Sequence, residues 1–140
     1  MESDTGFVGA KLALFLGEEL LVIRRDDRPD IPWPDFLDFP GGGREGDEGP
    51  EACALRETLE EVSLDLPDTV LIWRRSYDRP HGRVWFFVAR VEDWRVDDVV
   101  LGDEGQGWEM MSADAYLAHP DSIPHFRGYL LDYLESERAA

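Results

Sequence analysis

Apolar stretches separated by turns predict strands along most of the chain. Turn residues at 17–19 and at 78–82 each separate two stretches rich in β-branched and aromatic residues, as expected for strands joined in pairs. The segment between them contains a proline- and aspartate-rich part that predicts an ordered loop. The predicted strands are residues 7–15, 20–24, 36–39, 69–77, 83–91 and a short one within 105–112.

A second pattern, with a period near that of a helix, predicts three helices. Pro50 suits the first turn of a helix that runs to about Ser63. Ser112 is a suitable N-cap for a short helix, and Pro124 opens a final one. Strands interspersed with so few helices predict a mixed α/β (α+β) sandwich and argue against a doubly wound parallel sheet.

The helix that begins at Pro50 is predicted to be amphipathic. A rotation of about 100° per residue places its apolar side chains on one stripe that should pack on the sheet. Glu57, Glu60 and Glu61 fall on the opposite side, and Arg56 lies within i+4 reach of Glu60. The outer face is therefore expected to carry three carboxylates together. The residues of the apolar stripe are Ala52, Leu55, Leu59, Val62 and Leu66.

This carboxylate face has two interpretations. The simpler one is a solvated acidic surface. Two features argue for chemistry instead: the glycines of residues 41–48 let the backbone approach the helix closely, and a hard divalent cation stabilises clustered carboxylates. Because Mg²⁺ uses few carboxylates and completes its octahedron with water and substrate phosphates, the pattern favours a metal-assisted reaction on phosphates.

Length and charge narrow the class of partner. The 140 residues suit one domain, residues 1–140, and a net charge of -17 argues against duplex nucleic acid or an anionic membrane as partner. A small phosphorylated ligand is still compatible, since a few arginines or bound cations can hold it. The single Cys53, an acidic N-terminus without an apolar signal region and the lack of a membrane-length apolar run predict a cytoplasmic protein.

From Gly42 to Leu64 the chain resembles the Nudix box, G-x5-E-x7-R-E-U-x-E-E-x-G-U, in which U is a bulky apolar residue. Thr58 replaces an apolar position and Ser63 replaces the glycine. The preceding LDFPGG is similar to the entry of the MutT-like branch, and RVWFFVARVEDW with GDEGQGWEMMS is similar to its later part. The matching positions of the box are Gly42, Glu48, Arg56, Glu57, Glu60, Glu61 and Leu64.

The resemblance implies a fold and a reaction. The fold would be a Nudix-type α/β/α sandwich, with the box helix packed on a mixed sheet in a single Nudix domain. The reaction would be Mg²⁺-dependent hydrolysis of a diphosphate linkage, with Mn²⁺ as an alternative cation. In this family Glu57 and Glu61 would be the principal metal ligands, and the ligand set would be completed by Glu60, Glu104 and the Gly41 carbonyl.

The resemblance leaves some roles open. The general base would be Glu57, Glu60 or Glu104, and Arg56 would orient a glutamate through a charge-assisted hydrogen bond. Arg25 is a candidate ligand of the substrate phosphates, although an exposed charge at a strand end is an equal alternative. Gly42 and Glu48 of the box are also expected on the substrate side of the site.

The expected substrate is a nucleoside triphosphate or a related nucleotide. The alternatives are ADP-ribose or a nucleoside-diphosphate sugar, or a non-catalytic Nudix module that only binds a nucleotide. The partner is thus a diphosphate-containing small molecule, and a homodimer stays open.

Outside the box, the expectations are mostly structural. His81, His119 and His125 are expected at the surface, and Cys53 is expected to be a small helix residue. Trp33 either stacks on a base or anchors its loop on the core, and the anchor is favoured. At the end of the box helix, either Ser63 stays helical or it adopts a strained left-handed conformation.

Overall fold

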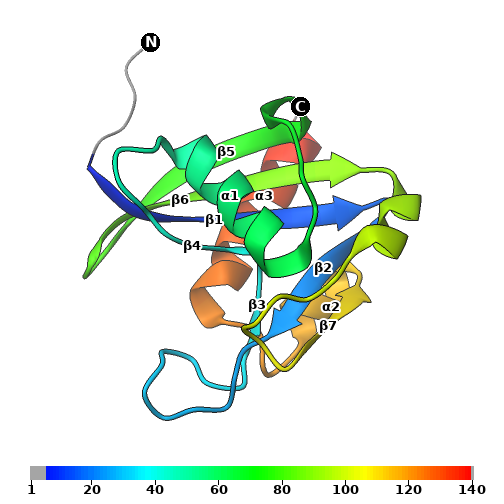
Figure 1. Ribbon diagram of the computed structural model, residues 1–140. Coiled ribbons are helices and arrows are strands. Elements are labelled where there is room, and N and C mark those ends of the chain that lie inside the picture. The colour runs from blue at the N-terminus through cyan, green and yellow to red at the C-terminus, as the bar shows by residue number, and fades with distance from the viewer. Residues whose placement is uncertain (1–5, 140) are drawn as a thin grey trace.

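A seven-stranded mixed sheet lies at the centre of this computed structural model, which describes residues 6–139 (Figure 1). The main strand order is β3-β2-β1-β6-β5, while β4 pairs with β1 and β7 pairs with β2. The pair β1–β6 is parallel and the others are antiparallel. The strands are β1 (Phe7–Leu16), β2 (Glu19–Arg24), β3 (Leu37–Asp38), β4 (Gly41–Gly43), β5 (Leu71–Arg79), β6 (Gly82–Val91) and β7 (Gly107–Met111).

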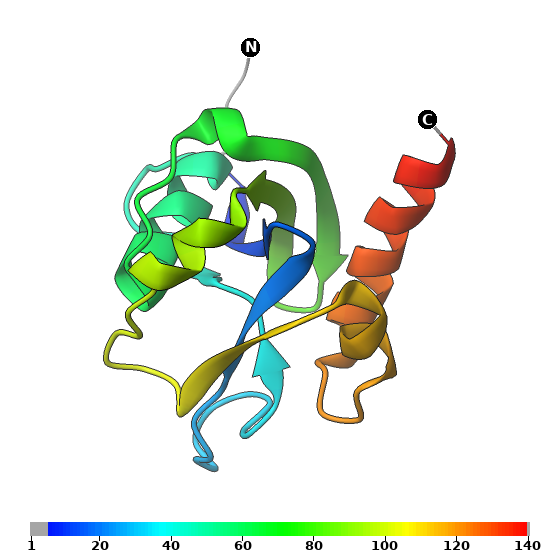
Figure 2. The ribbon, with the colours of Figure 1, turned by 90° about the vertical axis from the view of Figure 1, so that its right-hand side faces the viewer.

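Helices cover both faces of this sheet. Helix α1 (Pro50–Val62) lies on one face, and α2 (Ala113–Ala118) and α3 (Pro124–Ala139) lie on the other (Figure 2). Short 3₁₀ helices, η1 (Asp68–Val70) and η2 (Asp93–Asp98), complete the connections. The mixed α/β sandwich expected from the sequence is confirmed.

Strand β1 is buried on both faces and so joins two core layers. Leu12 and Leu14 contribute to the layer beneath α1, whereas Ala13 and Phe15 contribute to the layer beneath α2 and α3. Side chains alternate in this way because successive residues of a strand point to opposite faces. Full burial of each leucine contributes about 1.5–3 kcal/mol to stability.

Two of the sequence predictions concern a signal segment and a membrane-spanning segment. Residues 1–5, on which the expectation of no signal segment partly rests, lie outside the described residues. Within residues 6–139, none of the helices combines the length and apolar character needed to cross a bilayer.

The three glycines after Pro40 form strand β4, which the sequence did not predict as a strand. Gly42 pairs with Ala10 of β1 and lies directly under helix α1. A Cβ atom on Gly42 would lie 2.6 Å from Glu57 Oε1, and the φ of 137° at Gly41 is unfavourable for other residues. The glycines therefore allow the backbone to approach the carboxylates of the helix.

The buried face of α1 differs from the predicted apolar stripe. Ala52 is exposed and Leu59 is 45% exposed, whereas Thr58 is fully buried. The Thr58 hydroxyl donates to the Ala54 carbonyl at 2.8 Å, which satisfies it inside the core. The predicted stripe was wrong at Ala52 and Leu59, because it counted apolar residues alone, while close packing of α1 on β4 and β1 favours small side chains. The other three residues of the stripe agree with the prediction, since Val62 and Leu66 are buried and Leu55 packs against the same core. The buried positions are Pro50, Cys53, Ala54, Thr58 and Val62.

The prediction that all three glutamates lie on the outer face of α1 was also wrong. The Glu60 side chain is 56% exposed, but that of Glu57 is 18% exposed. Glu61 is also partly buried and accepts a hydrogen bond from the Gly41 N–H at 2.7 Å. Glu57 and Glu61 therefore lie toward the glycine strand, and Glu60 lies toward solvent.

Ser63 ends α1 in the left-handed conformation, with φ 67° and ψ 20°. Its N–H donates to the Leu59 carbonyl at 3.0 Å, and its Oγ donates to the Val100 carbonyl at 2.8 Å. Of the two alternatives for this position, the strained helix end is the one observed. The second hydrogen bond offsets part of the strain.

Substitutions of Ser63 are expected to separate these two contributions. Ser63→Gly removes the left-handed strain, worth about 1–2 kcal/mol, and loses a hydrogen bond worth about 0.5–1.5 kcal/mol. Ser63→Ala loses the same hydrogen bond but keeps the strain. In urea denaturation the glycine variant should therefore be about 1 kcal/mol more stable than the alanine variant. Equal stabilities would show that the strain is negligible.

Candidate active site

Arg56 on α1 joins the helix to the loop before it. Its Nε and Nη2 donate to the Glu48 carboxylate at 3.0 and 2.8 Å, and Nη2 also donates to the Gly43 carbonyl at 3.0 Å. Its Nη1 donates to Glu60 at 3.1 Å. The pairing raises the pKa of Arg56 and lowers that of Glu48 to about 2. Arg56 thus holds the Glu48 and Glu60 side chains against α1.

Glu48 was expected on the substrate side of the site. Besides its ion pair with Arg56, one of its oxygens accepts from the Glu45 N–H at 2.9 Å. Both oxygens are therefore engaged within the protein, and this geometry suits the ordering of the loop before α1. The structure offers no direct support for contact between Glu48 and substrate.

Glu57 lies between Arg56 and the glycine strand. Its Oε1 is 3.5 Å from Arg56 Nη1, and the missing Cβ of Gly42 leaves it room. Burial raises the pKa of Glu57, and the charge of Arg56 opposes that rise. The carboxylate is thus held close to backbone, with one cation on its outer side.

Glu61 is the more strongly perturbed carboxylate. Burial raises its pKa to about 7, although Lys11 and the Gly41 N–H favour the charged form. Glu61 lines a small cavity of about 240 Å³ that Glu104 also lines. The structure therefore brings Glu61 and Glu104, which are far apart in sequence, to one cleft.

The expected metal ligands are only partly assembled. Glu57 and Glu61 flank the glycine strand and Glu104 faces the cleft, but Glu60 pairs with Arg56. Among residues 6–139, no group of three or more His, Cys, Asp or Glu side chains forms a metal site by itself. These hard oxygen donors nevertheless fit Mg²⁺, because Mg²⁺ commonly takes one or two carboxylates and completes its shell with water and phosphates.

The Gly41 carbonyl has a partner that the sequence did not indicate. Lys11 Nζ donates to it at 3.1 Å, to the Phe39 carbonyl at 3.2 Å and to Asp38 Oδ2 at 3.0 Å. The same Asp38 oxygen accepts from Arg25 Nη1 at 2.8 Å. A buried carboxylate with two cationic partners therefore lies beside the glycine strand.

Arg25 is consequently not a free strand-end charge. Its Nε also donates to the Pro32 carbonyl at 2.9 Å, and its side chain is 25% exposed. Arg25 and Asp38 line both the small cleft and a larger cavity. These two residues therefore form the wall shared by the small cleft and the larger cavity.

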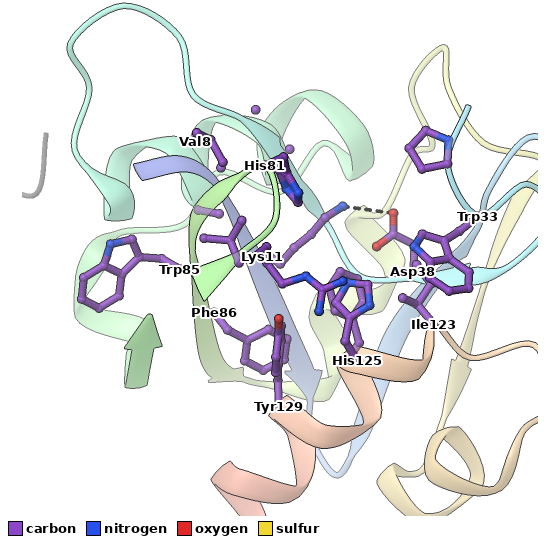
Figure 3. A pocket seen from close by; sticks show the side chains of 18 of the residues that line it. Val8, Lys11, Trp33, Asp38, His81, Trp85, Phe86, Ile123, His125 and Tyr129 are labelled. Atoms are coloured by element: carbon purple, nitrogen blue, oxygen red, sulfur yellow. Dashed lines mark hydrogen bonds and ion pairs between the residues drawn. The ribbon is translucent and has the colours of Figure 1, made fainter. Parts of the chain in front are cut away.

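The larger cavity has a volume of about 520 Å³ and lies on the α3 side of the sheet (Figure 3). Lys11 from β1 and His125 and Tyr129 from α3 surround the same space. Gly42 and Gly43 also line it, so the cavity reaches the glycine strand. A planar organic group in this cavity would lie next to phosphates held at the carboxylates. Its aromatic lining is Trp33, Trp85, Phe86, Phe126, Tyr129 and the two histidines His81 and His125.

Trp33 keeps its favoured role as a loop anchor, whereas His125 corrects the sequence expectation. The Trp33 ring packs on Phe36 at 5.2 Å between ring centroids and on His125 at 5.9 Å, yet Trp33 is 38% exposed at the cavity wall. It thus anchors its loop and also faces the cavity. His125 is half-buried, and burial lowers its pKa to about 4, so its expected surface position was wrong.

The sequence reasoning missed most of this cavity. Its α3 residues, Phe126 and Tyr129, recur at helical spacing after Pro124, and that spacing was the one available signal. The strand residues Lys11 and Arg79 carried no such signal, because their distance from α3 depends on the β1–β6 and β5–β6 pairings.

Comparison with solved structures identifies the fold. A mutT/nudix family protein from Listeria innocua matches with a TM-score of 0.74, covering 99% of this chain and 97% of that one at 22% sequence identity. At this identity the likeness bears on the fold alone. The Nudix-type sandwich that the sequence predicted is confirmed.

Comparison of sequences identifies the relatives. The NUDIX domain family model matches residues 8–134. The 8-oxo-dGTP diphosphatase of Escherichia coli (strain K12) is 35% identical over 96 residues, which span 67% of this chain and 70% of that protein. The RNA pyrophosphohydrolase of Acidiphilium cryptum (strain JF-5) is 36% identical over 117 residues, which span 81% and 68%. Several other relatives are matched over about half of their own length.

The fold, the carboxylates beside the glycine strand and these relatives together define a hydrolase that acts on phosphoric anhydrides. The chain belongs to the Nudix family. The family predicted from the motif between Gly42 and Leu64 is thus confirmed.

Proposed function

We propose that this protein is a Mg²⁺-dependent pyrophosphohydrolase that cleaves a diphosphate linkage in a nucleoside triphosphate or a related nucleotide. The observation that carries the proposal is the junction of two spaces at the glycine strand. Glu61 and Glu104 line the small cleft, an aromatic cavity lies beside it, and Asp38 and Arg25 line both. Phosphates and a planar base fit these two spaces respectively.

The carboxylates supply the binding site for the cation. Glu57 and Glu61 would hold it with Glu104 nearby, and the bound cation would neutralise phosphate charge and activate water. Arg56 keeps Glu57 in place, and the Gly41 N–H fixes one oxygen of Glu61. The protein thus presents preorganised oxygens to a cation that the substrate phosphates help to bind.

A water molecule attacks one phosphorus, and the phosphate beyond it leaves. Negative charge develops on the leaving oxygen, so nearby cations stabilise the transition state. Arg25 lines both spaces, and Lys11, which binds the same Asp38, lines the larger one, so both contribute positive charge near the junction. The proton of the attacking water would pass to Glu57 or Glu104. Glu60 is the weaker candidate, because it is exposed and paired with Arg56.

A panel of substrates tests this function directly. We expect at least one nucleoside triphosphate to be hydrolysed with Mg²⁺ or Mn²⁺, with release of phosphate or pyrophosphate, and chelation by EDTA to stop the reaction. Preferential cleavage of ADP-ribose or a nucleoside-diphosphate sugar would assign the alternative substrate class. If none of these compounds is hydrolysed at millimolar Mg²⁺, the protein is a binding module and the enzymatic proposal is wrong.

A further inference from the structure

Two buried polar atoms in the aromatic cavity lack a well-formed hydrogen bond among residues 6–139. They are the Tyr129 hydroxyl on α3 and Nε of Arg79 at the end of β5. Tyr129 is only 7% exposed, and its ring stacks on Tyr77 at 3.7 Å between centroids, which fixes its direction. A buried donor without a well-placed acceptor is unfavourable, so a ligand that supplies one gains affinity.

The two atoms lie in the same part of the cavity. Burial raises the pKa of Tyr129, and both the positive charge of Arg79 and weak hydrogen bonding from its side chain oppose that rise. Arg79 also contributes to the lowered pKa of His125, after the larger effect of burial. Arg79, His125 and Tyr129 line the same cavity, and Arg79 lies close enough to both α3 side chains to affect their charge.

The other buried charges of the cavity are already satisfied. Lys11 and Arg25 both bind Asp38. Arg79 and Tyr129 thus remain as the groups suited to bind the polar edge of a ligand. Arginine Nε can only donate, so that edge must present an acceptor to it.

The ring environment specifies a planar aromatic ligand. The His125 ring lies 5.9 Å from Trp33, 4.7 Å from Phe126 and 5.6 Å from Tyr129 between centroids. Such a wall favours stacking and edge contacts with a base. Among bases, guanine and hypoxanthine present O6 and N7 as adjacent acceptors, the pair that arginine binds most often in nucleic acids, whereas adenine places a donor at the same position.

We propose that Arg79 and Tyr129 recognise the edge of the base and select a 6-oxopurine nucleotide over an adenine nucleotide. The inference rests on the proposed function, in which the cavity holds the base. Arg79 would donate to O6 and N7, and the Tyr129 hydroxyl would donate to O6. Adenine would leave the Arg79 donor facing an amino group.

Binding of two matched monophosphates tests the proposal without turnover. IMP and AMP differ in whether C6 carries an oxo or an amino group, and both can be titrated calorimetrically in EDTA. We expect IMP to bind about tenfold more tightly than AMP. Tyr129→Phe should reduce that preference to about threefold, because it removes the hydroxyl and keeps the stacked ring. Arg79→Lys should abolish the preference while it keeps the positive charge.

Tyr133→Phe is the matched control. Tyr133 is one turn further along α3 and is 1% exposed, and within residues 6–139 its hydroxyl also lacks a well-formed hydrogen bond, but it does not line the cavity. Its loss should leave the ratio of the two affinities unchanged. An equal loss of IMP and AMP binding in Arg79→Lys would show that Arg79 binds phosphate and would contradict the proposal.

The proposal and the enzymatic function can fail independently. Hydrolysis of guanine and adenine nucleoside triphosphates with equal kcat/KM, together with equal binding of IMP and AMP, would overturn the base selection but leave the pyrophosphohydrolase intact. Failure of both monophosphates to bind would also overturn the base selection. Preferential binding of IMP without hydrolysis of any nucleotide would support the selection and refute the enzymatic proposal.

Discussion

Glu61→Gln is expected to lower turnover of the preferred nucleotide by about a thousandfold, the loss typical when one preorganised electrostatic group is removed. The amide keeps the size of the side chain but removes one charge from the cation site, and its carbonyl oxygen can still accept from the Gly41 N–H. The measurement is kcat at saturating Mg²⁺. A variant within about threefold of the wild type would show that Glu61 is not a principal metal ligand.

The same substitution should stabilise the cation-free protein. The pKa of Glu61 is raised from 4.5 to about 7, so the fold favours the protonated carboxyl. Its contribution to stability is therefore present below about pH 4.5 and is lost as pH rises through about 7. In EDTA at about pH 8, Glu61→Gln should raise the free energy of unfolding by about 2 kcal/mol.

Added Mg²⁺ should narrow this difference in stability. At about pH 8, Mg²⁺ at ten times its Kd should stabilise the wild type by about 1.4 kcal/mol and the Glu61→Gln variant much less. Glu18→Gln is a matched control, because the Glu18 side chain is 95% exposed and should leave all three measurements unchanged. If Glu61→Gln were less stable than the wild type in EDTA at that pH, the carboxylate would be stabilised by the fold rather than destabilised.

Arg56 substitutions are expected to have the largest effect on folding. Arg56→Met leaves Glu48 without the guanidinium to which it is doubly bonded, and the Gly43 carbonyl also loses its donor. Removing one partner of a largely buried ion pair commonly costs 3–5 kcal/mol, and we expect about 3 kcal/mol here because the Arg56 side chain is 22% exposed. Urea denaturation measures this change.

Arg56→Lys separates charge from geometry. Lysine keeps the positive charge but cannot donate to Glu48, Glu60 and the Gly43 carbonyl at once, so it should still cost about 2 kcal/mol and lower turnover. Arg28→Lys is the control, because Arg28 pairs with Asp30 at the surface with 59% of its side chain exposed. That change should stay below about 0.5 kcal/mol. Equal losses of stability in the two variants would show that Arg56 behaves as an ordinary surface charge.

The local sequence pattern was sufficient to predict most of the helices and strands. The helix that begins at Pro50, the cap at Ser112 and the hairpin at 78–82 all follow from local backbone preferences, which are short-range. The Ser112 hydroxyl accepts from the Ala115 N–H at 3.1 Å as an N-cap does. The failures, strand β4 and the buried face of α1, depend on the close contact between these two elements, which residue propensity does not encode.

By itself, the sequence determined the family, the order of the elements and the set of carboxylates, because motif spacing and side-chain periodicity are local properties of the chain. The tertiary structure alone decided which of those carboxylates are buried, because the glycine strand lets α1 approach and rotates Glu57 and Glu61 inward. The tertiary structure also decided which residues line the aromatic cavity. Arg79 and Tyr129 line one cavity only through the packing of α3 against the sheet, and the same packing buries their polar atoms.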